Sequence, residues 1–239
     1  MVLSRRRWLV AATLSVPAAA LGLLAAEVVL ARQGPHLAGP SVDYHAAGAT
    51  TAVWVGDSTA VGVGTADAQD GVASRVGRAR GERVVMLAVS GATAADVVDT
   101  QLDRVEGLAP AVVYVSVGAN DVTHLTSPAD FGSAYRQLLD RLVALPGVRV
   151  VALGVPDMGS PPRLRQPLRA LAGVRGRQLD RVIRDQVRRH PGVTYVDIAG
   201  PTRRPFRDEP HRYFSADRYH PSAAGYELWA RAVLEALGP

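Results

Sequence analysis

The chain has 239 residues, of which 48% are hydrophobic and 21% are charged. This length suits one sizeable domain with its own core, and this composition excludes intrinsically disordered and fibrous proteins. The chain contains no cysteine, which excludes disulfides, thiolate metal sites and cysteine nucleophiles.

The formal net charge of +5 comes mostly from one end of the chain. Residues 1–32 hold four arginines and one glutamate, so they carry +3 of this charge and leave +2 for the rest. A nucleic-acid-binding protein needs a basic face with aromatic platforms, whereas aromatic residues make up only 5% of this chain. We therefore expect no nucleic-acid partner.

An export segment is predicted over residues 1–32. Residues 5–7 are all arginine and precede an apolar run that extends to Ala26, which is typical of a signal peptide or an N-terminal membrane anchor. Positive charge before the run keeps the N-terminus in the cytoplasm. We expect the rest of the chain to lie outside, either anchored to the cell membrane by this segment alone or secreted after cleavage. Residues 33–50, rich in Gly, Pro and Ala, are predicted to be a linker.

Residues 51–239 show alternating strand and helix patterns. Five apolar runs predict strands over residues 51–56, 83–89, 111–117, 148–155 and 193–198. Nearly continuous apolar runs are typical of parallel strands that are buried on both faces. Helix-length segments cover residues 71–80, 92–106, 127–145, 163–190 and 222–237. This alternation predicts a flavodoxin-like three-layer α/β/α sandwich with a central parallel five-stranded sheet and no second domain.

Polar residues follow the carboxyl ends of the predicted strands, where ligands bind in sheets of this kind. Ser58 follows the first strand, Gly91 the second and Asn120 the third. Asp217 and His220 precede the last helix. Acyl transfer requires a nucleophile, a base, a group that orients the base, and donors for an oxyanion. The sequence therefore predicts a serine hydrolase site at one edge of the sheet.

Four segments carry a family resemblance: GDST from residue 56, SGAT from 90, GAND from 118 and DRYHP from 217. In this order they resemble the four sequence blocks of the SGNH (GDSL-type) hydrolases, and the resemblance extends over residues 51–239. It implies a serine esterase with Ser58 as nucleophile, His220 as general base and Asp217 orienting His220. It also implies an oxyanion hole formed by Ser58, Gly91 and Asn120. One departure is Thr59, where the eponymous motif often has leucine.

Other patterns are interpreted more simply. Ser58 by itself also fits a plain helix cap, Asp121 is interpreted as a brace for its loop, and His211 as a surface residue. His124 either lies on the surface or lines the pocket. Residues 62–67 imitate a dinucleotide-binding motif but lack its third glycine, and no H-E-x-x-H motif is present. We expect neither a cofactor nor a metal.

The substrate class remains open between small-molecule and carbohydrate esters. Residues 156–166, expected to form a specificity loop, contain arginine and proline and few large apolar residues, which favours a polar substrate. Acyl transfer to, or deacetylation of, a cell-envelope carbohydrate would use the same residues. The alternative from a different class is a non-catalytic domain that only binds glycans.

Overall fold

A computed structural model describes residues 50–238, which form a sheet of five parallel strands. The strands are β1 (Thr50–Gly56), β2 (Glu82–Met86), β3 (Val112–Ser116), β4 (Arg149–Leu153) and β5 (Val193–Val196). Their order is β2-β1-β3-β4-β5, with every neighbouring pair parallel. This is the flavodoxin-like order, so the predicted fold class is confirmed.

The predicted export segment and linker lie outside the described residues, except for Thr50, which begins β1. Export and anchoring therefore stay predictions. Within residues 50–238, none of the helices is both long enough and apolar enough to cross a bilayer.

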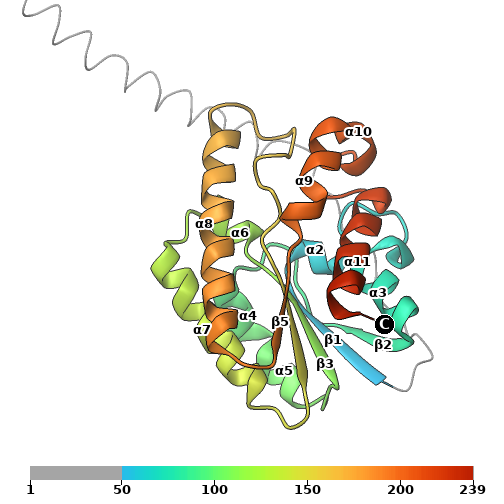
Figure 1. The fold of residues 1–239 in the computed structure, drawn as a ribbon, viewed down its shortest axis with the longest axis vertical. Helices are drawn as coiled ribbons and strands as arrows, with labels where there is room; N and C mark the ends of the chain where they lie inside the picture. The colour runs from blue at the N-terminus through green and yellow to red at the C-terminus, as the bar shows by residue number, and fades with distance from the viewer. Residues whose placement is uncertain (1–49, 239) are drawn as a thin grey trace, which may run out of the picture.

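Helices cover both faces of the sheet (Figure 1). One face carries α4 (Ala94–Thr100), α5 (Leu102–Glu106), α6 (Ala119–Thr123), α7 (Pro128–Val143) and α8 (Leu168–Arg189). The other face carries α2 (Ser58–Val61), α3 (Val72–Arg80), α9 (Ala199–Asp208), α10 (Pro210–Tyr213) and α11 (Ala223–Leu237). Three layers result, with one hydrophobic core on each side of the sheet.

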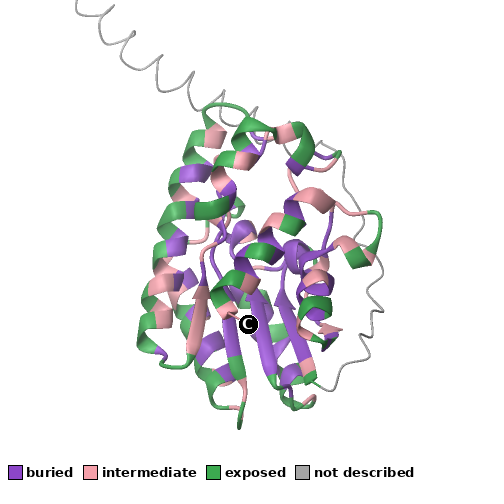
Figure 2. Cartoon of the chain, turned by 45° about the vertical axis from the view of Figure 1, so that its right-hand side comes forward, coloured by how far each residue is buried: buried purple, intermediate pink, exposed green. Residues whose placement is uncertain are grey.

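Alternation along the inner strands supplies both cores. Val53 and Val55 of β1 pack under α4 to α8, whereas Ala52 and Trp54 pack on the opposite side. The inner strands are buried, but β5 is mostly half-buried and β2 mixes buried, half-buried and exposed residues, because each of these edge strands has a neighbour on one side only (Figure 2). Burial on both faces, expected for all five strands, therefore holds for β1, β3 and β4.

Several helices differ from the sequence-based expectation. The helix predicted over residues 92–106 is two helices, α4 and α5, which meet at Gln101. The short helices α2, α6 and α10 were not predicted, because four or five residues are too few to show a helical period. Helix α9 contains Pro201 and Pro205, which made its sequence resemble a loop.

The predicted start of α7 is confirmed. The Ser127 hydroxyl accepts a hydrogen bond from the Asp130 backbone N–H at 3.1 Å, and Pro128 occupies the first helical position. The cap fixes where the helix begins and thereby which residues, such as Phe131 and Tyr135, face the sheet.

Candidate active site

Ser58 is the first residue of α2 and lies directly beyond the carboxyl end of β1. Asp57, and not Ser58, caps this helix: its Oδ1 accepts from the Thr59 N–H at 2.9 Å. Thr59 replaces the leucine common in the motif and uses its hydroxyl, which lies 2.7 Å from Asp57 Oδ1 and 2.8 Å from Ser116 Oγ. Hydrogen bonds between Thr59 and Asp57 thus hold the turn that presents Ser58. The Ser58 hydroxyl does not cap the helix.

The residue before this turn must be glycine. A Cβ at Gly56 would lie 1.9 Å from the Ser116 carbonyl oxygen of β3, and φ at Gly56 is +135°. The Gln101 side chain grips the same residue, accepting from the Gly56 N–H at 2.8 Å and donating to its carbonyl at 2.9 Å. Sequence analysis missed Gln101, because a polar residue in a helix ordinarily faces solvent and gives no signal.

Asp217 and His220 lie in the turn between α10 and α11. The turn is closed by a hydrogen bond of 2.8 Å from the Ser215 N–H to the His220 carbonyl, and Arg218 within it has φ of +60°. Asp217 Oδ1 accepts from the backbone N–H groups of Tyr219 and His220, each at 2.9 Å. These bonds fix the carboxylate relative to the imidazole ring.

The structure joins the predicted serine, histidine and aspartate in one line of hydrogen bonds. His220 Nδ1 lies 2.6 Å from Asp217 Oδ2, and His220 Nε2 lies 2.9 Å from Ser58 Oγ. Burial opposes ionisation of Asp217, but hydrogen bonds from His220 and Tyr219 outweigh it and hold the pKa of this carboxyl well below its usual range. An ionised Asp217 accepts a hydrogen bond from Nδ1–H, which keeps the proton on Nδ1 and leaves Nε2 to accept from the serine hydroxyl.

Gly64 is a second site residue that the sequence did not reveal. It packs against the turn that carries His220: a Cβ at Gly64 would come within 2.3 Å of the Pro221 carbonyl oxygen and 3.1 Å of His220 Cβ. In the sequence this glycine belongs to the run that imitates a nucleotide-binding motif. Its role in the structure is to let the turn that carries His220 approach the segment that follows α2.

The two remaining oxyanion candidates are placed differently. Asn120, in α6 beyond β3, lines the same pocket as Ser58 and His220. Its amide donates to the Ala92 carbonyl at 3.0 Å, which ties α6 to the loop that contains Gly91. Gly91 itself is exposed, has φ of +89° and is not among the residues that line the pocket.

The residues interpreted as structural also have definite positions. Asp121 Oδ2 accepts from the Ala94 N–H at 3.0 Å, so it braces the start of α4, as the sequence interpretation has it. His124 and His211 are exposed, and neither lines the pocket. Within residues 50–238 no group of three or more His, Asp or Glu side chains is arranged to hold a metal ion.

The pocket beside Ser58 is a small cavity of about 40 Å³. Part of the expected specificity loop lines it, from Pro156 to Pro161. Its apolar wall consists of Met158, Phe206, Phe214 and Trp229. The pocket therefore has one polar end, at Ser58 and His220, and an apolar wall.

The Asp57 carboxylate that caps α2 is buried, which is electrostatically unfavourable for its charged form. Burial raises its pKa from the ordinary value to about 6, and hydrogen bonds from Thr59 offset this only in part. Among the described residues, its Oδ2 has no hydrogen-bond partner. A raised pKa means that its contribution to stability is complete below the unfolded-state pKa and is lost as pH rises through the folded value.

We expect Asp57→Asn to gain stability relative to the wild type as pH rises. Between about pH 5 and pH 8 the free energy of unfolding of the wild type should fall by about 1 kcal/mol relative to that of the variant, because an amide does not ionise. Urea unfolding of both proteins across this range measures the difference. Asp99→Asn, which removes an exposed carboxylate from α4, is the control for loss of a negative charge. A difference between Asp57→Asn and wild type that does not change with pH would contradict the expectation.

A flavodoxin-like sheet with serine, histidine and aspartate joined beyond the ends of its strands is the arrangement typical of a serine hydrolase. The chain belongs to the GDSL-like lipase/acylhydrolase family, whose family model matches residues 54–228. This agrees with the resemblance of the four sequence blocks. A GDSL-like esterase of Mycobacterium tuberculosis is 37% identical over 194 residues. That match covers 76% of this chain and 60% of the relative, so the chain spans about three fifths of the relative's length.

Solved structures share the fold. TesA has a TM-score of 0.63 at 22% identity, over 79% of this chain and 98% of TesA. LAE5, an alpha/beta hydrolase from the metagenome of Lake Arreo in Spain, has a TM-score of 0.61 at 24% identity, over 80% and 95%. Axe2, an acetylxylan esterase from Geobacillus stearothermophilus, has a TM-score of 0.58 at 19% identity, over 82% and 97%. At these identities the likeness concerns the fold.

Proposed function

We propose that this protein is a serine esterase that cleaves carboxylic esters through a covalent acyl-enzyme. Ser58 is the nucleophile, His220 the general base and Asp217 the residue that orients His220. The observation that carries the proposal is the hydrogen-bonded line from Asp217 Oδ2 to His220 at 2.6 Å and from His220 to Ser58 Oγ at 2.9 Å. A domain that only bound glycans would have no use for this alignment.

In the first half of the reaction, Ser58 Oγ attacks the ester carbonyl carbon while His220 Nε2 takes the hydroxyl proton. The negative charge of the tetrahedral intermediate develops on the former carbonyl oxygen. His220 then gives its proton to the departing alkoxide, which leaves as an alcohol, and the acyl group remains on Ser58. Asp217 stabilises the transient imidazolium and holds the tautomer, and it gains no proton itself.

In the second half, a water molecule takes the place of the alcohol. His220 accepts a proton from the water as its oxygen attacks the acyl carbon, and then returns that proton to Ser58 Oγ. The products are one carboxylic acid and one alcohol for each water consumed. A sugar hydroxyl in place of the water would give acyl transfer instead of hydrolysis.

The oxyanion hole is assigned to the backbone N–H groups of Ser58 and Gly91 and to the Asn120 side chain. An asparagine amide carries two N–H bonds, and the Ala92 carbonyl takes one of them. The second is left for the oxyanion. The bond to Ala92 ties Asn120 to the loop that contains Gly91, and this link supports the assignment of both residues to one oxyanion hole.

The direct test of this function is acyl-enzyme formation in the wild type. We expect rapid mixing with 4-nitrophenyl acetate to release a burst of 4-nitrophenol close to one equivalent when deacylation is slower than acylation. A fluorophosphonate probe should attach to Ser58, as located by peptide mass spectrometry. Modification of another residue with no label on Ser58, together with turnover, would refute the assignment of the nucleophile.

Removal of the amide donor tests the oxyanion hole. We expect Asn120→Ala to lower kcat by about 10²-fold to 10³-fold with little change in KM, because the donor acts chiefly in the transition state. Asn120→Asp keeps the shape but places an acceptor where a donor is required, so it should be at least as damaging. If KM alone rises in both variants, Asn120 binds the ground-state substrate instead.

A further inference from the structure

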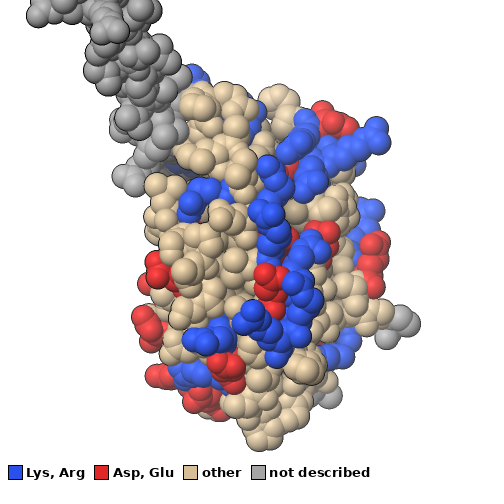
Figure 3. Space-filling view, turned by 60° about the vertical axis from the view of Figure 1, so that its left-hand side comes forward, with Lys and Arg blue, Asp and Glu red and all other residues tan. Residues whose placement is uncertain are grey.

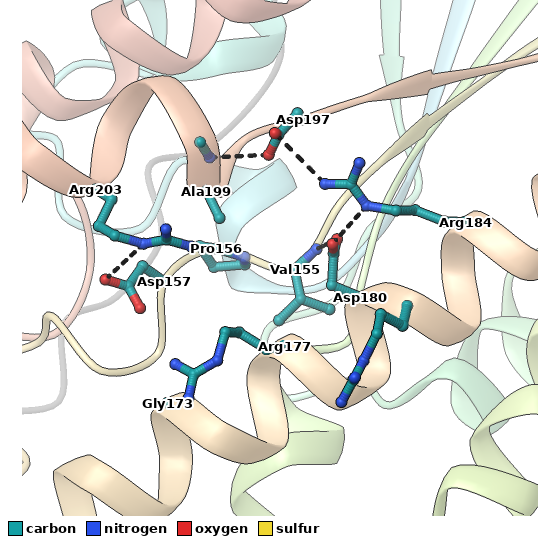
Figure 4. Close-up of a pocket in the computed structure, with 12 residues that line it drawn as sticks. Val155, Pro156, Asp157, Gly173, Arg177, Asp180, Arg184, Asp197, Ala199 and Arg203 are labelled. Carbon is teal, nitrogen blue, oxygen red and sulfur yellow. Dashed lines mark hydrogen bonds and ion pairs between the residues drawn. The ribbon is translucent and has the colours of Figure 1, made fainter.

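A second and larger hollow, of about 360 Å³, lies beside the active-site pocket. It is bounded by α8, by the loop that follows β4 and by the beginning of α9. Pro156, Asp157 and Arg203 line both cavities, so the two lie next to each other. Figure 4 shows Arg203 entering from α9 on one side of the hollow and Arg177 from α8 on the other.

The hollow is rich in arginine. Arg177, Arg181 and Arg184 of α8 and Arg203 of α9 line it. Figure 3 shows a strip of basic side chains along the face of the molecule where α8 and α9 lie. Four guanidinium groups around one hollow repel one another, and such a cluster is typical of a site for an anion.

The acidic residues of the hollow are already committed to other partners. Asp180 Oδ1 accepts from the Tyr195 hydroxyl at 2.7 Å and the Val155 N–H at 3.1 Å, and its Oδ2 from Arg184 Nε at 2.9 Å. Asp197 Oδ1 accepts from the Gly200 N–H at 2.8 Å. These two carboxylates therefore hold the backbone and Arg184 in place and form no ion pair with Arg177 or Arg181.

Asp157 organises the boundary between the two cavities. Its side chain is 3% exposed, and its Oδ2 forms ion pairs with Arg207 Nη2 at 2.7 Å and Arg203 Nε at 3.6 Å. Its oxygens also bind the Ser160 hydroxyl at 2.7 Å and the Gly159 N–H at 3.3 Å. A buried carboxylate thus orients two arginines, of which Arg203 lines both cavities and has N–H groups that can bind a ligand.

Arg177 and Arg181 have no hydrogen-bond or ion-pair partner among residues 50–238. They lie four residues apart in α8, which places them on the same face of the helix, toward the hollow. These two guanidinium groups are solvent-exposed, line the hollow that adjoins the active-site pocket, and have no partner within the described part of the chain, which makes them the strongest feature of this region.

We propose that this hollow is a subsite for an anionic group, a carboxylate or a phosphate, carried by the ester substrate. Arg177 and Arg181 bind the anion, and Arg203 bridges to the pocket where Ser58 reacts with the ester carbonyl. The inference rests on the proposed esterase function and narrows the substrate class from esters in general to anionic esters. It agrees with the polar substrate that the loop over residues 156–166 favours.

The test compares anionic esters with neutral esters of matched length. One pair places the charge on the acyl side: the 4-nitrophenyl monoester of glutarate against 4-nitrophenyl valerate. The other pair places a phosphate on the alcohol side: 1-acetylglycerol 3-phosphate against 1-acetylglycerol. Hydrolysis of this pair is measured from the acid that it releases. We expect kcat/KM to favour the anionic member of at least one pair by about tenfold or more, chiefly through KM. The two pairs distinguish a carboxylate from a phosphate.

The variant Arg177→Gln/Arg181→Gln should reduce this anionic-to-neutral ratio by about tenfold. Arg188→Gln/Arg189→Gln removes the same charge from exposed positions of α8 outside the hollow and is the matched control. Its ratio should stay within about twofold of wild type. An equal decrease of the anionic-to-neutral ratio in both double variants would overturn the proposal, because the preference would then depend only on the net charge of the protein.

A binding measurement separates this inference from the esterase proposal. Titration of the Ser58→Ala protein with glutarate and with inorganic phosphate should show saturable binding of at least one of them. The binding should disappear when Arg177→Gln/Arg181→Gln is added. Absence of binding together with no preference in either ester pair would refute the subsite while leaving esterase activity intact. Undiminished turnover by Ser58→Ala would instead refute the catalytic proposal alone.

Discussion

Ser58→Ala is expected to lower kcat/KM for 4-nitrophenyl acetate by about 10⁴-fold or more. The variant lacks the only atom that can form the acyl-enzyme, while His220, Asp217 and the pocket remain. The loss should lie in kcat, and the burst of 4-nitrophenol should vanish with it. Steady-state and rapid-mixing kinetics on the same preparation measure both effects.

The fold should survive this substitution. In the described residues, the Ser58 hydroxyl bonds only to His220, and Asp57 caps α2. The temperature of unfolding should therefore move little. Ser133→Ala, at an exposed position of α7, is the matched control and should keep wild-type kinetics. Turnover by Ser58→Ala above about one hundredth of the wild-type rate would exclude a serine nucleophile at this position.

Asp217→Asn is expected to reduce kcat by about 10³-fold to 10⁴-fold. An asparagine oxygen can still accept from the backbone N–H groups of Tyr219 and His220, so the turn should keep its shape. Its amide, however, would place a donor against His220 Nδ1, which favours the tautomer with the proton on Nε2. That tautomer cannot accept the Ser58 proton.

The readout that separates this effect from simple damage is the tautomer of His220. Nitrogen chemical shifts of the ring should show the Nδ1–H form in wild type and the Nε2–H form in Asp217→Asn. His220→Ala should be more damaging than Asp217→Asn, because the amide still holds the ring near Ser58. Wild-type activity in Asp217→Asn would remove Asp217 from the mechanism. Asp185→Asn, an exposed acid on α8, is the control for loss of a carboxylate.

Together these residues show a site whose reacting groups are held by neighbours that do not react. Gly56 and Gln101 set the end of β1, Gly64 gives His220 room to approach, and Asp57 holds the turn before Ser58. Asp57 does so with a raised pKa, which is a cost in stability at neutral pH. Such a cost is acceptable where it positions a nucleophile.

The fold class and the parts of the site could be predicted from the sequence. Inner strands such as β1 and β3 are buried on both faces, so their apolar runs stand out from the polar segments around them. Parallel strands all end at one edge of the sheet, so residues that directly follow them, such as Ser58 and Asn120, had to lie near one another.

Other features depend on contacts between distant parts of the chain, and only the tertiary structure decided them. Gln101 forms hydrogen bonds with Gly56, which lies 45 positions earlier in the sequence. A helical pattern does not indicate which polar side chain points into the protein. The proposed anionic subsite depends on Arg177 of α8 and Arg203 of α9, which lie on facing sides of one hollow. In the sequence, arginines on α8 fit the solvated face of an amphipathic helix, because periodicity specifies which residues are exposed but not what they face.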